Sequence, residues 1–149
     1  MTDPALSPAD EDLLRRAIGL AARAVELGDA PYGSLLAGPD GTVLAEEHNT
    51  VRRDGDITAH PELKLARWAA RELDAETAAR TTVYTSCEPC GMCGGGAIVR
   101  SGLGRVVYAL STGQLVALNP ESGAWPVVPQ DGPALHDEAR APVEAYYRR

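Results

Sequence analysis

The first third of the chain shows a helical pattern followed by two strand patterns. Residues 11–28 ("EDLLRRAIGLAARAVELG") carry apolar side chains every three or four positions, which is the spacing of one face of a helix. A Ser-Pro pair precedes this pattern and a glycine closes it, as is usual at helix ends. Residues 32–49 ("YGSLLAGPDGTVLAEEHN") contain two short apolar runs around a Pro-Asp-Gly turn, which is the composition of a hairpin. The pattern therefore predicts one helix and then two paired strands.

The middle of the chain alternates helix and strand patterns. After a polar loop, residues 59–74 ("AHPELKLARWAARELD") form a helical stripe that begins near Pro61, and a proline suits the first turn of a helix. Residues 81–86 ("TTVYTS") and 104–111 ("GRVVYALS") are strand patterns, and the helix between them is expected to begin with Pro89. This order of elements predicts an α/β fold of three layers, α/β/α, with helices on both faces of a sheet.

The pattern weakens beyond residue 112. Residues 113–133 ("GQLVALNPESGAWPVVPQDGP") are rich in glycine and proline, and residues 134–147 ("ALHDEARAPVEAYY") predict a terminal helix interrupted at Pro142. No internal repeat and no linker divides the sequence. A chain of 149 residues is long enough to bury its own hydrophobic core, so residues 1–149 are expected to fold as one domain.

Composition and charge narrow the classes of partner. The formal net charge is -7, which disfavours a nucleic-acid partner because such proteins set Lys and Arg against phosphates. No run of apolar residues approaches the length that spans a bilayer, so no membrane partner is expected. The first residues ("MTDPALSPADED") lack the layout of a secretory signal, and a cytoplasmic location is the expectation.

All three cysteines lie within residues 85–96 ("TSCEPCGMCGGG"). An odd number of cysteines fits a disulfide framework poorly. Cys90 and Cys93 have Cys-x-x-Cys spacing, which serves two chemistries: a redox pair at a helix start, or two thiolate ligands of one metal ion. The choice between them depends on whether a third soft ligand is available.

Three histidines could supply that ligand: His48, His60 and His136. His60 stands thirty residues before Cys90, at the start of a predicted helix, and two residues before Glu62. A catalytic zinc takes three protein ligands and keeps one open position, which His60 and the two cysteines would satisfy. A redox pair would leave the placement of His60 and Glu62 unexplained. A closed structural zinc site would need His48 or His136 as a fourth ligand.

The pattern His-x-Glu followed by Pro-Cys-x-x-Cys resembles the signature of zinc deaminases. Four blocks ("PYGSLLAGPDGTVLAEEHNTV", "DITAHPE", "TSCEPCGMCGGGAI" and "GLGRVVYAL") resemble, in the same order, those of the cytidine deaminase-like superfamily. The similarity is greatest to its branch of guanine deaminases, related nucleobase deaminases and tRNA adenosine deaminases, and it covers roughly residues 10–111. Two departures are Pro61, where that branch commonly has alanine, and the three glycines Gly94–Gly96.

The resemblance implies a cytidine deaminase-like fold with a mixed sheet and one Zn²⁺ per chain, held by His60, Cys90 and Cys93. It implies hydrolytic deamination through a zinc-bound hydroxide, with Glu62 as the proton shuttle. It also implies that Asn49 holds the substrate base and that Cys87 lies near the site without binding the metal. The alternative for Asn49 is an asparagine that caps a turn at the end of a strand. Further residues are expected to line or cover the pocket: Tyr32, Ala59, Ser86, Cys87, Glu88, Trp125, Tyr146 and Tyr147.

By the same resemblance the partner is a small amino heterocycle such as guanine, cytosine or a triazine-like ring, and a free base is favoured over a nucleoside. A homodimer is expected, with the C-terminal segment, about residues 112–149, covering the site. Two alternatives remain. A tRNA-editing adenosine deaminase would use the same chemistry, but the acidic balance of the chain weighs against it. A catalytically silent zinc-containing scaffold would have no need of Glu62.

Overall fold

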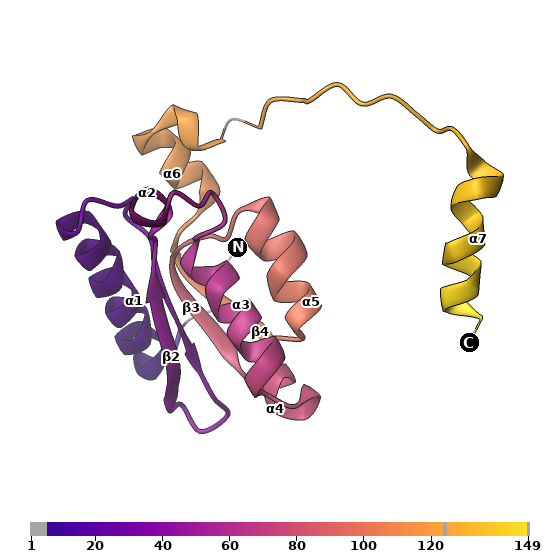
Figure 1. The fold of residues 1–149 in the computed structure, drawn as a ribbon. Helices are drawn as coiled ribbons and strands as arrows, with labels where there is room; N and C mark the ends of the chain where they lie inside the picture. The colour runs from indigo at the N-terminus through magenta and orange to yellow at the C-terminus, as the bar shows by residue number, and fades with distance from the viewer. Residues whose placement is uncertain (1–5, 124, 149) are drawn as a thin grey trace, which may run out of the picture.

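The computed structural model of the protein describes residues 6–123 and 125–148. Its centre is a four-stranded sheet with the strand order β2-β1-β3-β4 (Figure 1). The strands are β1 (Gly33–Ala37), β2 (Val43–His48), β3 (Thr82–Cys87) and β4 (Arg105–Leu110). Strand β1 runs antiparallel to β2 and to β3, whereas β3 runs parallel to β4. The expected mixed sheet is confirmed.

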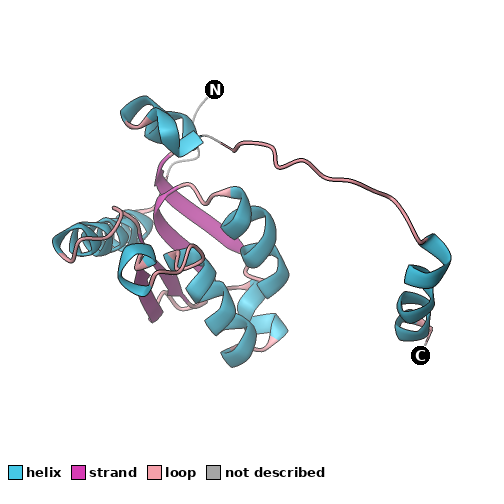
Figure 2. Cartoon of the chain, turned by 45° about the horizontal axis from the view of Figure 1, so that its top comes forward, coloured by secondary structure: helices cyan, strands magenta, loops and turns pink. Residues whose placement is uncertain are grey.

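Helices cover both faces of this sheet (Figure 2). Helix α1 (Pro8–Glu26) packs on one face, where it contacts all four strands. Helix α3 (Pro61–Glu72) lies on the opposite face beside a continuous helix made of a π-helical part, η1 (Gly91–Ile98), and an α-helical end, α5 (Val99–Ser101). The three-layer α/β/α architecture is therefore confirmed.

The central strands divide their side chains between the two helical layers. Leu35 of β1 and Tyr84 of β3 belong to the cluster packed against α1. Leu36 and Val83, their neighbours in sequence, belong to the cluster packed against α3. Successive strand residues point to opposite faces of the sheet. Alternate residues of one strand therefore pack against α1 and against α3. A sheet covered on both faces also explains why every residue of β1 is buried.

Gly33 permits the close approach of β1 to α1. A Cβ atom at this position would lie 2.4 Å from the backbone nitrogen of Ala21 and 2.5 Å from the carbonyl oxygen of Ala17. Both atoms belong to the helix backbone, which cannot move aside as a flexible side chain would. The glycine that opens β1 is therefore a packing requirement.

Three details differ from the sequence-based expectations. The loop after β2 contains a short helix, α2 (Val51–Asp54), and another short helix, α4 (Ala75–Ala79), precedes β3. The helix expected from Pro89 begins at Gly91 instead, because Cys90 has extended backbone angles and forms the N-cap.

The C-terminal part leaves the body of the molecule. It comprises α6 (Thr112–Leu118), the 3-10 helix η2 (Pro120–Gly123), an extended stretch and α7 (His136–Tyr147). Helix α7 stands apart from the sheet and its helices (Figure 1). The expected interruption at Pro142 is wrong: α7 runs through it, since a proline removes one backbone hydrogen bond while its neighbours persist. Among the described helices, none combines the length and apolar character needed to cross a membrane.

A polar clasp joins the first helix to the sheet. The carboxylate of Asp10 accepts a hydrogen bond of 2.6 Å from the Tyr84 hydroxyl and bonds of 3.0 and 3.1 Å from the Arg105 guanidinium. Arg105 and Tyr84 hold the pKa of the Asp10 carboxyl well below its usual range. Burial and the bond to Asp10 raise the pKa of Tyr84 to about 12. The clasp thus ties α1, β3 and β4 together through one ionised carboxylate.

We expect Asp10→Asn to lower the free energy of unfolding at pH 7 by about 1–3 kcal/mol, because two buried or half-buried donors lose a charged acceptor. The folded-state pKa of Asp10 is depressed, so its contribution is present above the unfolded value near 3.9 and is lost as the pH falls further. Urea unfolding should therefore show the difference in free energy of unfolding between wild type and variant begin to narrow below about pH 5. It should go on narrowing to the lowest pH measured, because the full loss requires the pH to fall through the depressed folded-state pKa.

Asp12→Asn is the matched control, because Asp12 pairs with Arg15 on the exposed side of the same helix. This variant should differ little from wild type at any pH, since exposed pairs contribute little. If the difference in free energy of unfolding between wild type and Asp10→Asn stays constant down to about pH 3, the proposed contribution of the ionised Asp10 is wrong.

Candidate metal centre and active site

Two helix starts bring the three predicted metal ligands together. His60 is the N-cap of α3, and Pro61 occupies the first helical turn. Cys90 is the N-cap of η1, and Cys93 lies in its first turn. Because α3 and η1 pack side by side on the same face of the sheet, residues thirty positions apart in the sequence meet at one point.

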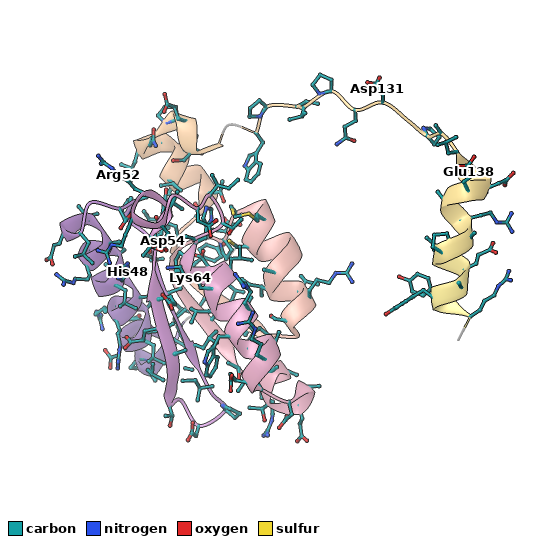
Figure 3. The ribbon with its side chains drawn as sticks, viewed as in Figure 1. His48, Arg52, Asp54, Lys64, Asp131 and Glu138 are labelled. Carbon is teal, nitrogen blue, oxygen red and sulfur yellow. The ribbon has the colours of Figure 1, made fainter. Side chains whose placement is uncertain are left out.

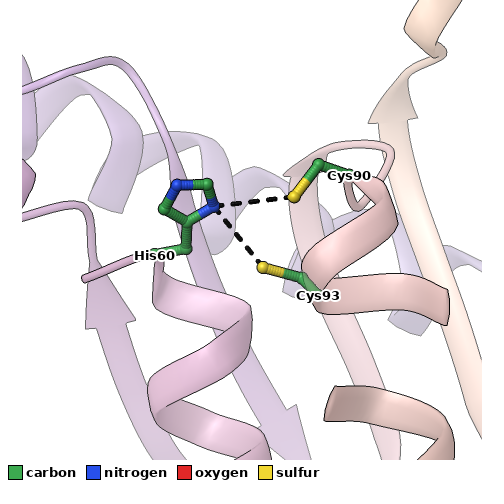
Figure 4. Close-up of side chains that lie close together, drawn as sticks. All are labelled: His60, Cys90 and Cys93. Atoms are coloured by element: carbon green, nitrogen blue, oxygen red, sulfur yellow. Dashed lines mark hydrogen bonds between the residues drawn. The ribbon is translucent and has the colours of Figure 1, made fainter. Parts of the chain in front are cut away.

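The distances between these side chains fit a tetrahedral zinc ion. Nδ1 of His60 lies 3.7 Å from Sγ of Cys90 and 3.5 Å from Sγ of Cys93 (Figure 4). Zinc bonds of about 2.3 Å to sulfur and 2.0–2.1 Å to nitrogen, at tetrahedral angles, place nitrogen and sulfur about 3.6 Å apart. The three ligand atoms all lie within 4.8 Å of one another. The residues present therefore fit the ion without rearrangement.

The electrostatics of the cluster favour a thiolate. The neighbouring Cys93 thiol and then the His60 ring hold the pKa of Cys90 well below its usual range. The hydrogen bond to Cys90 and burial raise the pKa of Cys93, and the bond to Cys90 raises the pKa of His60. A divalent cation bound between the two sulfurs would hold both as thiolates.

The other candidate ligands lie elsewhere. In residues 6–123 and 125–148, the cluster able to hold a metal consists of His60, Cys90 and Cys93 alone. Cys87 is buried and free, and burial raises the pKa of its thiol. Nδ1 of His48 lies 3.1 Å from a backbone carbonyl oxygen, and His136 is on the outlying α7. A closed four-ligand site is therefore not formed by the described residues.

Glu62 lies beside the cluster, in the first turn of α3, two residues after His60. Its side chain is 6% exposed, and Oε1 accepts a hydrogen bond of 2.6 Å from the Thr85 hydroxyl. Glu62 also lines a pocket. A buried carboxylate that is hydrogen-bonded on one side and faces a pocket on the other is placed to exchange protons with a bound molecule.

The pocket beside Glu62 has a volume of about 230 Å³. His60 and Cys90 of the metal cluster line it, and so do three of the predicted contact residues: Tyr32, Cys87 and Glu88. Three further residues come from the segment after β4: Leu115 of α6, Ser122 of η2 and Trp125. The sequence suggested Trp125 as a lid residue, whereas nothing in the pattern of Leu115 or Ser122 distinguishes them from surface residues.

The other predicted substrate contacts do not line this pocket. Asn49 is 3% exposed, and its Oδ1 accepts a hydrogen bond of 3.0 Å from the backbone of Val51, which is a turn-capping contact. Ala59 and Ser86 are buried, and the Ser86 hydroxyl accepts from the backbone of Gly33. The roles of these three residues toward a substrate stay predictions.

A lysine on α3 holds the loop that carries Asn49. Nζ of Lys64 donates to the carbonyl oxygen of His48 at 3.0 Å and to the hydroxyl of Thr50 at 2.6 Å. The same hydroxyl donates to Asp54, and these side chains gather at the end of β2 (Figure 3). Lys64 therefore anchors the residues on both sides of Asn49 to the helix that begins with His60.

The glycines after Cys93 have unequal surroundings. A Cβ atom at Gly94 would lie 3.3 Å from Cβ of Pro89, whereas one at Gly95 or Gly96 would meet nothing within 4 Å. Close packing accounts for Gly94 alone. The helix is π-helical over this stretch, as is frequent where a helix borders a functional site.

Comparison with known proteins agrees with this geometry. The family model of the cytidine and deoxycytidylate deaminase zinc-binding region matches residues 7–110. The chain belongs to this deaminase family. The match includes the histidine, both cysteines and Glu62, and it confirms the resemblance found in the sequence motifs.

Individual relatives of this deaminase differ in the substrates that their names give. The Schizosaccharomyces pombe protein named "Probable cytosine deaminase" is 33% identical over 147 residues, which are 97% of this chain and 86% of that protein. The crystal structure of guanine deaminase from Bacillus subtilis superposes with a TM-score of 0.77 and 30% identity, covering 93% of this chain and 94% of that one. The Haemophilus influenzae tRNA-specific adenosine deaminase is 34% identical over 105 residues, which are 70% of this chain and 60% of that protein.

These relatives establish the class of enzyme. Each is named a deaminase, so this chain is a hydrolytic deaminase by family. The enzyme class and the fold predicted from the sequence are confirmed, and the ligand and substrate roles of single residues are tested below.

Replacing Cys90 by alanine should lower both zinc content and stability. Removal of one of three protein ligands leaves two, too few for a catalytic zinc site, so metal analysis after dialysis should find well under half of the wild-type zinc. The melting temperature should fall with it, because metal binding contributes to folding. Cys87→Ala is the matched control and should keep its zinc. Full metal occupancy in Cys90→Ala would overturn the ligand assignment.

Proposed function

We propose that this protein is a zinc-dependent hydrolase that removes the amino group of a free nucleobase or similar heterocycle. The observation that carries the proposal is the convergence of His60, Cys90 and Cys93 at coordination distance, beside a buried Glu62 that lines a pocket. One zinc ion per chain, bound by the three side chains, would lower the pKa of water in its open position to near 7.

Glu62 moves the protons of this reaction. The oxygen of a water molecule bonds to the ring carbon that carries the amine, and Glu62 takes the proton released from that water. The carboxyl gives that proton to a ring nitrogen, takes the second proton from the hydroxyl now on the ring carbon, and gives it to the departing amine. The carbon–nitrogen bond breaks, ammonia leaves, and the ring keeps the oxygen as a carbonyl. A general acid–base group of this kind contributes about 10²–10⁴-fold to the rate.

The pocket favours a free base over a nucleoside. Its volume of about 230 Å³ lies below the range of roughly 300–1,000 Å³ that is usual for drug-sized ligands. Tyr32, Leu115 and Trp125 supply flat or apolar walls, which suit the faces of an aromatic ring. Two of the relatives described above are named for cytosine and guanine. These observations support a single amino-substituted ring as the substrate.

A tRNA-editing adenosine deaminase is the second candidate, because relatives with that name share about a third of the aligned residues. The net charge of -7 counts against a polynucleotide substrate. A silent scaffold is a weaker alternative, since Glu62 is present, buried and hydrogen-bonded in the pocket.

Ammonia release by the zinc-loaded protein tests the proposal against a panel of guanine, cytosine, adenine, their nucleosides, amino-triazines and a tRNA anticodon stem-loop. We expect turnover of at least one free ring. Glu62→Gln should keep its zinc and its fold and lose about 10²–10⁴-fold in kcat. Wild-type rates in Glu62→Gln would overturn the mechanism, and turnover of the stem-loop alone would favour the tRNA candidate.

We also propose that the single deaminase domain forms a cytoplasmic homodimer, with the segment after β4 covering a site. Val127 and Val128 are 92% and 74% exposed on the extended stretch before α7. Figure 1 shows that stretch leading away from the body. Contiguous exposed apolar side chains mark surfaces that pack against another molecule, and a second copy of this chain is the partner that the resemblance suggests.

Light scattering coupled to size-exclusion chromatography should give twice the chain mass of 15.7 kDa. Replacing Val127 and Val128 together by aspartate should shift the protein toward the monomer, because burying two unpaired charges at an interface is costly. Asp131→Ala, on the same stretch (Figure 3), is the control and should leave the mass unchanged. A wild-type monomer would contradict the assembly.

A further inference from the structure

Two hydroxyl-bearing residues lie directly beneath Glu62. Ser34 of β1 and Thr85 of β3 are partners in the antiparallel register, and each is 0% exposed. Directly opposed residues place their side chains on the same face of the sheet, about 5 Å apart. Their second neighbours along the strands, Leu36 and Val83, pack toward α3, so both hydroxyls point toward α3 as well.

These hydroxyls form a chain of hydrogen bonds that ends on the carboxylate. Oγ1 of Thr85 lies 2.6 Å from Oε1 of Glu62 and 2.7 Å from Oγ of Ser34. Ser34 Oγ lies 3.2 Å from the same Oε1. Each hydroxyl has one hydrogen to donate, so Thr85 donates to Glu62 and Ser34 donates to Thr85 by the shorter contact. A separation of 2.6 Å is typical of a hydroxyl bound to an ionised carboxylate.

Both contacts with Glu62 fall on one of its two carboxylate oxygens. Oε1 receives them, whereas Oε2 makes no hydrogen bond with any residue in the described part of the chain, and Glu62 lines the pocket. The last side-chain torsion angle of a glutamate takes a broad range of values when no hydrogen bond restrains the carboxylate. A carboxylate fixed through Oε1 therefore presents Oε2 to the pocket in one orientation.

We propose that Ser34 and Thr85 are positioning residues that aim Glu62 at the substrate. The inference rests on the proposed role of Glu62 as the proton carrier. Alanine and valine would pack well at these two buried strand positions, but they would leave Oε1 buried without a donor. Burial of the two hydroxyls is unfavourable unless they are hydrogen-bonded, and the bonds that satisfy them lead to Glu62.

The test is Thr85→Val, which keeps the shape of the side chain and removes its donor. A reacting group that is displaced by about 1 Å can lose 10²-fold in rate. We expect kcat to fall about 10- to 100-fold while KM stays within about threefold, because the binding walls of the pocket are unchanged. Thr85→Ser should restore most of kcat. Ser34→Ala should have a smaller effect of about 3- to 10-fold, because Thr85 still donates to Glu62.

Thr81→Val is the matched control. Thr81 is also buried, and its hydroxyl donates to the carbonyl oxygen of Thr77 at 2.8 Å, away from the site. This variant should lose a similar amount of melting temperature with kcat unchanged. Zinc content, measured for every variant, should stay at the wild-type level.

The outcomes separate this inference from the proposed function. Wild-type rates in Glu62→Gln would contradict the proposed mechanism itself. Loss of activity in Glu62→Gln with a wild-type kcat in Thr85→Val would overturn the positioning role alone. Crystal structures of wild type and Thr85→Val decide without any substrate. The carboxylate of Glu62 should keep one orientation in wild type and move or become divided in the variant, and an unchanged orientation would overturn the inference.

Discussion

The packing of α3 against η1 on one face of the sheet is the constraint on which the site depends. Both helices begin at the same end of the central strands, so their N-caps, His60 and Cys90, are brought within coordination distance. The apolar cluster beneath them includes Leu36, Leu65 and Ile98, which are buried between the helices and the sheet. The geometry of the proposed metal site therefore rests on a hydrophobic contact, because a shift of either helix would change the distances between the three side chains directly.

The sheet face that packs against α3 changes from apolar to polar side chains along the strands. Toward α4 it carries Val83 and Leu36, which are apolar and packed. One pair of residues further along, it carries Thr85 and Ser34, and then Cys87 in the wall of the pocket. The two buried hydroxyls of this face lie where the carboxylate of α3 satisfies them. Polar side chains at these two positions bury less apolar surface than aliphatic ones would, but they hold the Glu62 carboxylate in one orientation.

The sequence was sufficient for the parts of the site that lie in short local motifs. His60, Glu62, Cys90 and Cys93 could be predicted because helix starts fix their spacing, and the helix and strand periods predicted the three layers. Ser34 and Thr85 could not be found in this way. A threonine is common in strands because of its β-propensity, so its presence there does not indicate a functional role. Their role depends on the register between β1 and β3, which pairs residues fifty-one positions apart.

The residues proposed to carry out the chemistry lie in local motifs, whereas the residues expected to select the substrate come from a different segment of the chain. The proposed metal ligands and Glu62 come from the starts of α3 and η1, within residues 60–93, and the deaminase family model covers this whole region. Leu115, Ser122 and Trp125 close the pocket from the segment after β4, beyond the last residue that the model matches. Relatives of similar identity are named for cytosine, guanine and tRNA adenosine, and we expect differences in this second set to account for the different names. Exchanging this segment is therefore expected to change which ring is bound and to leave the metal site intact.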